Sequence, residues 1–318
     1  MKIFITGSVG FIGFNLANFL LQNKKNKVYG IDSFDDYYSV KLKKKRLNLL
    51  KKNKNFYFKK IDICDHDNFK KYVGNKKFDI AINLAAQAGV RYSLINPQKY
   101  LKVNILGFLN FLKIFKKNSK KIFYASSSSV YGENTNFPLQ EKELLNPKNV
   151  YGITKKLNEV IAEDYYKKYD IKVVGLRFFT VYGEWGRPDM FFLKLFKSLK
   201  TKEKMYVNNF GNHDRDFTYV GDVVKILNKL FVQKIRKHEV YNICSNNPVN
   251  INEIIKNFKR KWKFKLKYRS MVQADVLKTH GSNKKILKLI NYKEFMNIDK
   301  GIQKSLEWYL KEKIYKIS

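Results

Sequence analysis

Tyr151 and Lys155 are a pair of side chains whose types and spacing could remove a proton from an alcohol. They are four residues apart at the start of a helix-length segment, which places them on one face of a helix. The phenol of a free tyrosine has a pKa of about 10, and a neighbouring ammonium group favours the phenolate. Tyr151 could therefore act as a general base near neutral pH. Four serines at 126–129 end an earlier apolar run, and a hydroxyl there could share the proton that Tyr151 removes.

A glycine turn near the start of the chain could hold a phosphate group. Residues 6–13 follow a TGxxGxxG pattern, with glycines at Gly7, Gly10 and Gly13 between a short apolar run and a helix-length segment. Glycines at this spacing allow a tight turn, a close approach of pyrophosphate to the backbone, and close packing of helix on strand. Free N–H groups at the helix N-terminus then face the phosphates. The pattern therefore predicts a dinucleotide-binding turn.

Asp32 indicates which dinucleotide the turn would hold. It ends the second apolar run, about twenty residues after the turn, where its carboxylate can bind the hydroxyls of an adenosine ribose. A 2′-phosphate would be repelled by this carboxylate, and Ser33 and Phe34 provide no arginine to receive one. The sequence therefore favours NAD over NADP. A positively charged nicotinamide near Tyr151 would further favour its phenolate.

Short apolar runs alternate with helix-length segments through the first 180 residues. The expected strands are residues 2–6, 27–32, 55–62, 78–84, 121–125 and 172–178, and the helices include 11–22, 100–117 and 150–169. Apolar strands in alternation with helices indicate a parallel sheet that is covered on both faces. The sequence predicts an α/β fold, a doubly wound Rossmann sheet with a smaller C-terminal substrate-binding lobe.

The expected division of the chain follows from where this alternation loosens, after about residue 183. Residues 1–180 form the Rossmann domain, and 216–245, with a strand near 240–244, return to it. Residues 181–215 and 246–318 form the second lobe, in which 251–261 and 299–311 are typical of surface helices.

Two further strand ends carry residues suited to a cofactor. Asp62 and Ile63 follow the third expected strand and could contact the adenine. Leu84, Ala85 and Ala86 follow the fourth, where small side chains let the backbone approach the cofactor. In doubly wound folds ligands bind outside the carboxyl ends of the strands, so the order of these residues fits a dinucleotide site.

The composition is strongly basic, with 64 Lys+Arg against 27 Asp+Glu and a net charge of +37. A charge of this size is typical of proteins that bind nucleic acid, but 56 of the basic residues are Lys, and they are spread over the whole chain. Proteins that recognise nucleic acid rely more on arginine, and their basic residues are concentrated on one face. We therefore interpret the charge as background composition and expect no nucleic acid as a partner.

Other classes of protein are disfavoured by what the sequence lacks. No apolar run of about 18 residues occurs, so no membrane insertion is expected. Residues 2–21 resemble a signal peptide only loosely, with three glycines and no small-residue cleavage site, and we expect a cytoplasmic protein. Two isolated cysteines and four scattered histidines predict neither a disulfide framework nor a metal site.

Several longer stretches resemble a known family. The glycine turn, the serine run and YxxxK, in this order, are similar to the extended short-chain dehydrogenases/reductases of the NAD-dependent epimerase/dehydratase type. Residues 84–93, 126–132, 176–183 and 185–190 resemble the nucleotide-hexuronate 4-epimerases within that group, of the UDP-glucuronate type. The resemblance covers nearly the whole chain and implies a Rossmann fold, bound NAD and a UDP-sugar substrate.

The resemblance also assigns roles to residues that spacing alone leaves open. It makes Ser127 the catalytic serine beside Tyr151 and Lys155, and it places Ser128 and Ser129 in the sugar pocket. Two positions depart from the family pattern: Asp36, where a neutral side chain often reaches the adenosine ribose, and Ala274, where glycine is common.

The motifs and the resemblance together give the expected binding residues. For the cofactor they are Gly7, Gly10, Phe11, Ile12, Gly13, Asp32, Ser33, Asp36, Asp62, Ile63, Leu84, Ala85, Ala86, Gln87, Asn104, Tyr151, Lys155 and Phe178. For the substrate they are Arg91, Ser127, Ser128, Ser129, Tyr151, Thr180, Arg187, Arg215, Gln273 and Asp275. Arg215 would contact the diphosphate, and Asp275 and Gln273 the uridine end.

The family usually forms homodimers through the helices at 100–117 and 150–169. The apolar stripe of Phe108, Phe111, Leu112 and Phe115 on the first helix suits such an interface, although burial in the core would give the same pattern. A homodimer is therefore expected.

The reaction that the family shares begins with oxidation of the sugar at C4, and extra residues decide the fate of the 4-keto sugar. Dehydratases of the group carry an Asp-Glu pair after the catalytic hydroxyl residue, and decarboxylases carry a Glu just before Val-Tyr-Gly. The chain has Ser128 and Ser129 at these positions, and neither can act as a carboxylic acid or base. This absence of a carboxyl group favours 4-epimerisation through a transient 4-keto sugar.

Thr180 and Arg187 point to a hexuronate. Thr180 replaces an Asn often found in hexose epimerases, and Arg187 lies seven residues later, with a guanidinium suited to a carboxylate. A 4-keto hexuronate is a β-keto acid that readily loses CO₂, so its epimerase must hold the carboxylate firmly. The sequence therefore predicts interconversion of UDP-glucuronate and UDP-galacturonate.

Three alternatives stay open at this point. They are a UDP-hexose or UDP-N-acetylhexosamine 4-epimerase, a UDP-glucuronate decarboxylase that makes a UDP-pentose, and a non-catalytic Rossmann protein that binds nucleic acid through its lysines. For Arg187, a salt bridge within the loop stays open as an alternative to the binding of a carboxylate.

Overall fold

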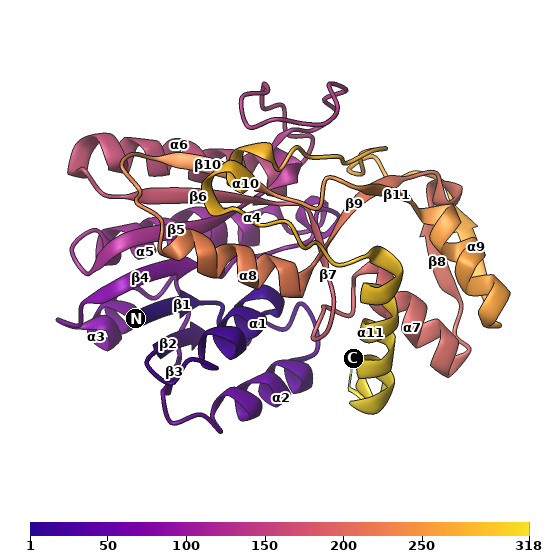
Figure 1. Ribbon diagram of the computed structural model, residues 1–318, viewed down its shortest axis with the longest axis horizontal. Helices are drawn as coiled ribbons and strands as arrows, with labels where there is room; N and C mark the ends of the chain where they lie inside the picture. Colours follow the sequence, from indigo (N-terminus) through magenta and orange to yellow (C-terminus); the bar gives the residue numbers. More distant parts are fainter. Residues whose placement is uncertain (318) are drawn as a thin grey trace.

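The computed structural model describes residues 1–317 and is built around a parallel sheet of seven strands. From top to bottom in Figure 1 the strand order is β10-β6-β5-β4-β1-β2-β3. The strands are β1 (Lys2–Thr6), β2 (Lys27–Asp32), β3 (Phe56–Lys60), β4 (Phe78–Asn83), β5 (Ser119–Ser127), β6 (Val173–Phe178) and β10 (Glu239–Ile243). The order reverses between β1 and β4, which opens a crevice at the carboxyl ends of the strands.

Helices cover both faces of the sheet, as the apolar runs require. On one face lie α1 (Phe11–Leu20), α2 (Val40–Leu50) and α8 (Val220–Phe231), whose apolar side chains share one core. On the other lie α3 (His66–Val73), α5 (Gly107–Phe115) and α6 (Val150–Tyr169). The predicted fold class, a doubly wound α/β sheet, is confirmed.

The segment predicted as one helix over 100–117 is built differently. It begins as the short helix α4 (Pro97–Tyr100), continues as a π-helical turn over Leu101–Leu106, and only then becomes α5. Within this turn, the carbonyl of Asn104 accepts a hydrogen bond of 2.7 Å from the side chain of Asn158 on α6. An inserted side chain of this kind is a known cause of such distortions.

The apolar stripe on α5 faces the sheet. Phe108, Phe111, Leu112 and Phe115 are all fully buried in the core with Phe4 and Tyr124. The proposed use of this stripe in a dimer interface is therefore wrong, because none of the four side chains reaches the surface.

The second lobe lies beside the carboxyl ends of the strands, at the right in Figure 1. It contains a three-stranded sheet of β7 (Thr180–Tyr182), β9 (Asp214–Tyr219) and β11 (Pro248–Asn250), and a pair of β8 (Met205–Asn208) with β12 (Leu266–Arg269). Its helices are α7 (Phe191–Thr201), α9 (Ile251–Lys261) and α11 (Ile298–Lys311). Helix α10 (Lys284–Ile290), which the sequence assigns to this lobe, packs instead against β10 and α8 of the central sheet (Figure 1). Single 3₁₀ turns cover Tyr92–Leu94, Ser128–Val130, Asn209–Gly211 and Ile314–Lys316.

The chain passes between the lobes more than once. After β9 in the small sheet, α8 packs against α1, and β10 joins the central sheet next to β6. None of the helices within residues 1–317 is long and apolar enough to span a membrane.

Candidate active site

A cavity of about 550 Å³ lies at the carboxyl ends of β1, β2, β4, β5 and β6, between the sheet and the second lobe. It brings together most of the residues predicted for the site. Those that line it are Gly7, Gly10, Phe11, Ile12, Gly13, Asp32, Ser33, Asp62, Ile63, Leu84, Ala85, Ala86, Gln87, Ser127, Ser128, Ser129, Tyr151, Lys155, Phe178, Thr180 and Arg187.

The glycine turn forms one end of this cavity, and two of its glycines are sterically required. Gly7 has a φ of +66°, and a Cβ there would lie 2.8 Å from the backbone nitrogen of Ala85. A Cβ on Gly13 would lie 2.1 Å from the carbonyl oxygen of Gly7. Helix α1 starts directly after Gly10, and no side chain caps its N–H groups. The turn therefore fits a dinucleotide, with free N–H donors for its pyrophosphate.

Asp32 ends β2 on the floor of the same cavity. Its carboxylate accepts hydrogen bonds from the backbone N–H groups of Phe34, at 2.9 Å, and Val9, at 3.4 Å. Burial raises its pKa above the ordinary value, although these hydrogen bonds and the charge of Lys43 oppose the rise. The buried carboxylate lines the cavity, so it could accept hydrogen bonds from ribose hydroxyls.

Several residues of the cavity lie outside the motifs. The wall near Asp32 includes Tyr37, Tyr38, Lys43 and Lys99. Lys43 lies 4.3 Å above the ring of Tyr38, and it is buried. The one sequence signal for it is its place beside Leu42 on the apolar face of α2, which alone does not distinguish a ligand-binding lysine from a packed one.

Tyr151, Lys155 and Ser127 meet in the middle of the cavity. Lys155 Nζ donates a hydrogen bond of 2.8 Å to the carbonyl of Ala125 and lies 5.8 Å from the centre of the Tyr151 ring. Burial raises the pKa of Tyr151, and a hydrogen bond from Ser127 partly offsets this rise. Burial also lowers the pKa of Lys155 to about 7. The protein alone therefore does not hold Tyr151 as a phenolate, and the expected help from a permanent ammonium group is weaker than the sequence suggests.

The low pKa of Lys155 predicts how the stability of the ligand-free protein depends on pH. The group has a pKa of about 7 when folded and an ordinary value of 10.5, so the unfolded chain binds this proton more tightly. Burial of the Lys155 charge therefore lowers the free energy of unfolding, and this loss of stability is complete below about pH 7. It decreases as the pH rises toward 10.5. We expect Lys155→Met, which removes the charge, to raise the melting temperature more at pH 6 than at pH 9.5. Equal changes at both pH values would contradict the buried, weakly basic amine.

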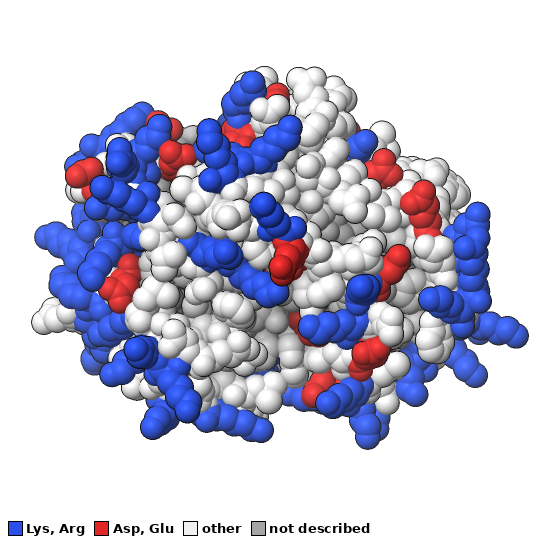
Figure 2. Space-filling model, in the orientation of Figure 1, with Lys and Arg blue, Asp and Glu red and all other residues white. Residues whose placement is uncertain are grey.

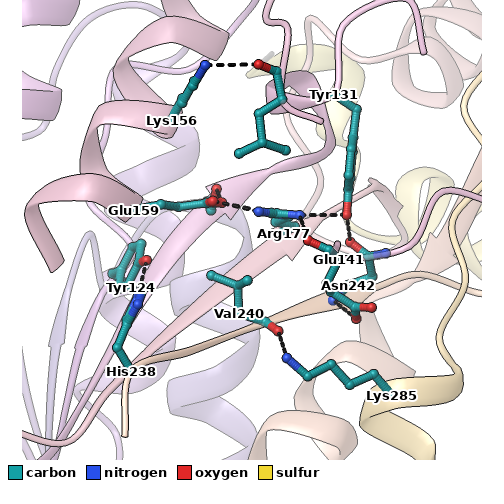
Figure 3. Close-up of polar contacts among 12 residues, drawn as sticks. Tyr124, Tyr131, Glu141, Lys156, Glu159, Arg177, His238, Val240, Asn242 and Lys285 are labelled. Carbon is teal, nitrogen blue, oxygen red and sulfur yellow. Dashed lines mark hydrogen bonds and ion pairs between the residues drawn. The ribbon is translucent and has the colours of Figure 1, made fainter. Parts of the chain in front are cut away.

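A buried network fixes the strand and helix that carry these residues (Figure 3). Arg177 on β6 forms two hydrogen bonds to Glu159 on α6, of 2.8 and 2.7 Å. Glu159 also accepts a hydrogen bond of 2.6 Å from Ser126, next to Ser127. Arg177 donates in addition to the hydroxyl of Tyr131 and to the carbonyl of Glu141. Glu159 lies four residues after Lys155, so one face of α6 carries Tyr151, Lys155 and the carboxylate that ties the helix to β5 and β6.

A second cavity of about 220 Å³ adjoins the first and shares Ser128, Ser129 and Thr180 with it. Arg91 and Asp275 also line it and form a two-point ion pair, of 2.7 and 3.2 Å, between the two lobes. These residues all belong to the predicted substrate set.

Arg215 lines the second cavity as well, and its guanidinium donates to the carbonyls of Val276 and Leu277. Burial lowers its pKa to about 10, which still leaves it charged at neutral pH. A cation at this end of the cleft suits a diphosphate.

Three predicted residues lie outside both cavities. Asp36 is exposed and lies 3.6 Å from Lys99 in an ion pair, while its neighbour Asp35 lines the main cavity. Gln273 is exposed on the second lobe. Asn104 is buried behind Gln87, whose backbone N–H and carbonyl both bind its amide. Asn104 can therefore shape the cavity wall but does not line it.

Known proteins share this arrangement along nearly the whole chain. A family model for GDP-mannose 4,6 dehydratases matches residues 4–305. The chain belongs to this family of NAD-dependent epimerases and dehydratases. The family resemblance seen in the sequence is thereby confirmed.

Individual relatives are similar over their full length. An uncharacterized protein of Methanocaldococcus jannaschii is 41% identical over an alignment of 318 positions that covers 98% of this chain and 97% of the relative. A UDP-glucuronate 4-epimerase of Thermodesulfobacterium geofontis is 36% identical over 309 residues, 96% of this chain and 94% of the relative. The solved UDP-glucuronic acid 4-epimerase of Bacillus cereus, in complex with UDP-glucuronic acid and NAD, has a TM-score of 0.92 and 31% identity and covers 98% of this chain and 100% of its own.

Proposed function

We propose that this chain interconverts UDP-glucuronate and UDP-galacturonate by inverting the sugar at C4. The observation that supports this most is the position of Arg187, a cation on the cavity wall that Tyr151, Lys155 and Ser127 also line. An arginine there can hold the carboxylate of a hexuronate. The likeness to UDP-glucuronate 4-epimerases supports the same substrate.

NAD is the cofactor that the cavity fits, held by the glycine turn, by Asp32 and by Lys155. When bound, it supplies the hydride acceptor and donor for C4. Ser127 and Tyr151 hold and transfer the proton of the C4 hydroxyl, and the hydrogen bond between them keeps that path short. Ser128, Ser129 and Thr180 line both cavities and provide hydroxyls, and none of the three can act as the carboxylic acid that a dehydratase uses to eliminate water.

Side-by-side assays with UDP-glucuronate, UDP-glucose and UDP-N-acetylglucosamine test the choice of substrate. The expected result is that kcat/KM for UDP-glucuronate exceeds the other two by at least about 100-fold, because only the uronate carboxylate uses the charge of Arg187. Preference for a neutral sugar would overturn the hexuronate assignment and favour the hexose epimerase. Stoichiometric release of CO₂ would instead favour a decarboxylase.

We further propose that the protein is a cytoplasmic homodimer, joined by α6 and the segment that precedes α5. These elements expose a run of apolar side chains, of which Leu106 is 57% and Val160 58% accessible, with Leu101 and Leu157 nearby in the same elements. Exposed apolar patches of this kind are typical of interfaces. The product would serve polysaccharide biosynthesis.

Two glutamates introduced on the exposed face of α6 test the proposed dimer. We expect Leu157→Glu/Val160→Glu to sediment as a monomer, whereas the unchanged protein sediments as a dimer. Both side chains are on the exposed face of α6, so the secondary structure should be retained. A monomeric unchanged protein, or a variant that remains dimeric, would contradict the proposed interface.

The excess of basic residues has a modest expected role. Figure 2 shows Lys and Arg scattered over the visible face and gathered at its edges, including the right edge, where α9 lies in Figure 1. A positive surface raises the local concentration of an anionic nucleotide sugar. The apparent affinity for the substrate should therefore weaken as the salt concentration rises.

A further inference from the structure

Arg187 is not a free cation on the cavity wall. It lies in the loop between β7 and α7, and its guanidinium is held by Asp189, two residues later in the same loop. Arg187 Nε donates to Oδ1 of Asp189 at 3.0 Å, and Nη2 donates to Oδ2 at 2.8 Å. Nη1 makes no hydrogen bond within residues 1–317. One edge of the guanidinium is therefore occupied, and the opposite edge is available.

Asp189 is itself fixed from the other lobe. The hydroxyl of Tyr37 donates to Oδ2 of Asp189 at 3.3 Å. Burial raises the pKa of Tyr37 to about 12, so the phenol stays protonated and keeps the O–H that it donates to Asp189. Burial would also raise the pKa of Asp189, but Arg187, with a smaller contribution from Lys194, lowers it overall and keeps the carboxylate ionised. Arg187 and Tyr37 line the cavity and Asp189 does not, so the carboxylate lies behind the guanidinium.

The backbone of this loop is held independently of Asp189. Arg46, fully buried on α2, donates to the carbonyls of Trp185 and Gly186, at 2.5 and 3.0 Å. The same guanidinium donates to the carbonyl of Val9 in the glycine turn, at 2.9 Å. Loss of the Asp189 carboxylate should therefore change the orientation of the Arg187 side chain without displacing the loop.

The orientation of that side chain matters because of the chemistry of the intermediate. A 4-keto hexuronate carries its carboxylate on C5, next to the C4 ketone. If the C5–C6 bond aligns with the carbonyl π system, that bond breaks, CO₂ leaves, and its electron pair forms an enolate that takes a proton from water at C5. A guanidinium whose one edge is held by Asp189 can bind the substrate carboxylate with its other edge and keep the C5–C6 bond out of this alignment. A mobile guanidinium cannot do so.

We propose that Asp189 is a positioning residue that fixes the orientation of the Arg187 guanidinium. This orientation then decides whether the 4-keto intermediate is epimerised or loses CO₂. This inference rests on the proposed function. It assigns to Asp189 and Tyr37 a part in the choice of product rather than in the transfer of hydride or proton.

Asp189→Asn tests the proposal, because asparagine keeps the size of the side chain but loses the charge and one of the two acceptors. The measured quantity is the ratio of CO₂ released to UDP-galacturonate formed from UDP-glucuronate. We expect this ratio to rise at least about tenfold, equivalent to about 1.4 kcal/mol between the two transition states. Asp189→Glu, which restores a carboxylate, should return the ratio part of the way. Glu203→Gln, which removes a carboxylate from a surface ion pair at the far end of α7, is the matched control and should leave the ratio unchanged.

A second measurement separates positioning from general damage. In a Tyr151→Phe background, where turnover is blocked, Asp189→Asn should weaken the binding of UDP-glucuronate about tenfold relative to that of UDP-glucose. If Asp189→Asn does not fold, Tyr37→Phe serves instead and should raise the CO₂ ratio in the same direction by a smaller factor.

The possible outcomes distinguish this inference from the function on which it rests. A variant that loses activity with an unchanged CO₂ ratio would show a merely structural role and overturn the inference, as would an unchanged ratio in Tyr37→Phe. If the wild-type protein epimerises UDP-glucuronate and the variants show the wild-type ratio of CO₂ to UDP-galacturonate, the inference alone is overturned. Unchanged protein that ignores UDP-glucuronate would overturn both.

Discussion

Replacement of Tyr151 by Phe should lower kcat for UDP-glucuronate by about 10³-fold, the middle of the range for loss of a general base. The substitution removes one oxygen, the phenol oxygen that is hydrogen-bonded to Ser127 and that we propose as the base. The ring itself keeps its edge-on packing against Tyr100, with centroids 6.2 Å apart. The variant should therefore fold and bind NAD and UDP-glucuronate nearly as before.

The matched control for this variant is Tyr166→Phe. It removes a phenol from the same helix, but Tyr166 does not line the cavity. Calorimetry with UDP-glucuronate and a steady-state assay should show retained binding and lost turnover for Tyr151→Phe alone. Substantial turnover in Tyr151→Phe would assign the base to another group.

The second large effect concerns Arg187. Arg187→Ala should lower kcat/KM for UDP-glucuronate by about 100-fold or more, since two hydrogen bonds between charged groups are each worth about 1.5–3 kcal/mol. The loss is increased because Asp189 then faces the substrate carboxylate without its counter-ion. Activity on a neutral UDP-sugar, however small, should fall much less.

A double variant separates these two contributions. Arg187→Ala/Asp189→Asn removes the cation without exposing an anion, and it should recover part of the loss seen in the single variant. Normal activity of Arg187→Ala on UDP-glucuronate, or an equal loss on neutral sugars, would show that the guanidinium serves the loop and not the substrate.

Much of the fold could be predicted from the sequence because its information is local. Apolar runs such as residues 78–83 can be buried on both faces only in a covered parallel sheet. The glycine turn is similarly explicit, since Gly7 and Gly13 leave no room for a side chain. The YxxxK pair is on one face of α6 because four residues make about one helical turn.

The features that the sequence does not predict depend on contacts between distant segments. The π-helical turn at 101–106 coincides with a hydrogen bond from Asn158, more than fifty residues away. The stripe that includes Phe111 is apolar in either environment, and only the position of the sheet shows that it is core. For Arg187 the sequence leaves open a salt bridge within the loop and a contact with the substrate, and the structure shows both its pairing with Asp189 and its place on the cavity wall.

Charge states are the least predictable part of the site. A lysine four residues from a tyrosine suggests a permanent positive charge, but complete burial brings the pKa of Lys155 to about 7. The depth of the cavity, which is set by the whole fold, therefore controls how readily Tyr151 loses its proton.

The most direct test of the proposed function uses UDP-glucuronate labelled with deuterium at C4. Inversion through a transient 4-keto sugar in one closed site removes and returns the same hydrogen. We therefore expect UDP-galacturonate with deuterium retained at C4, identified by NMR, and no net consumption of NAD. UDP-galacturonate that has lost the label, or no UDP-galacturonate at all, would contradict this mechanism.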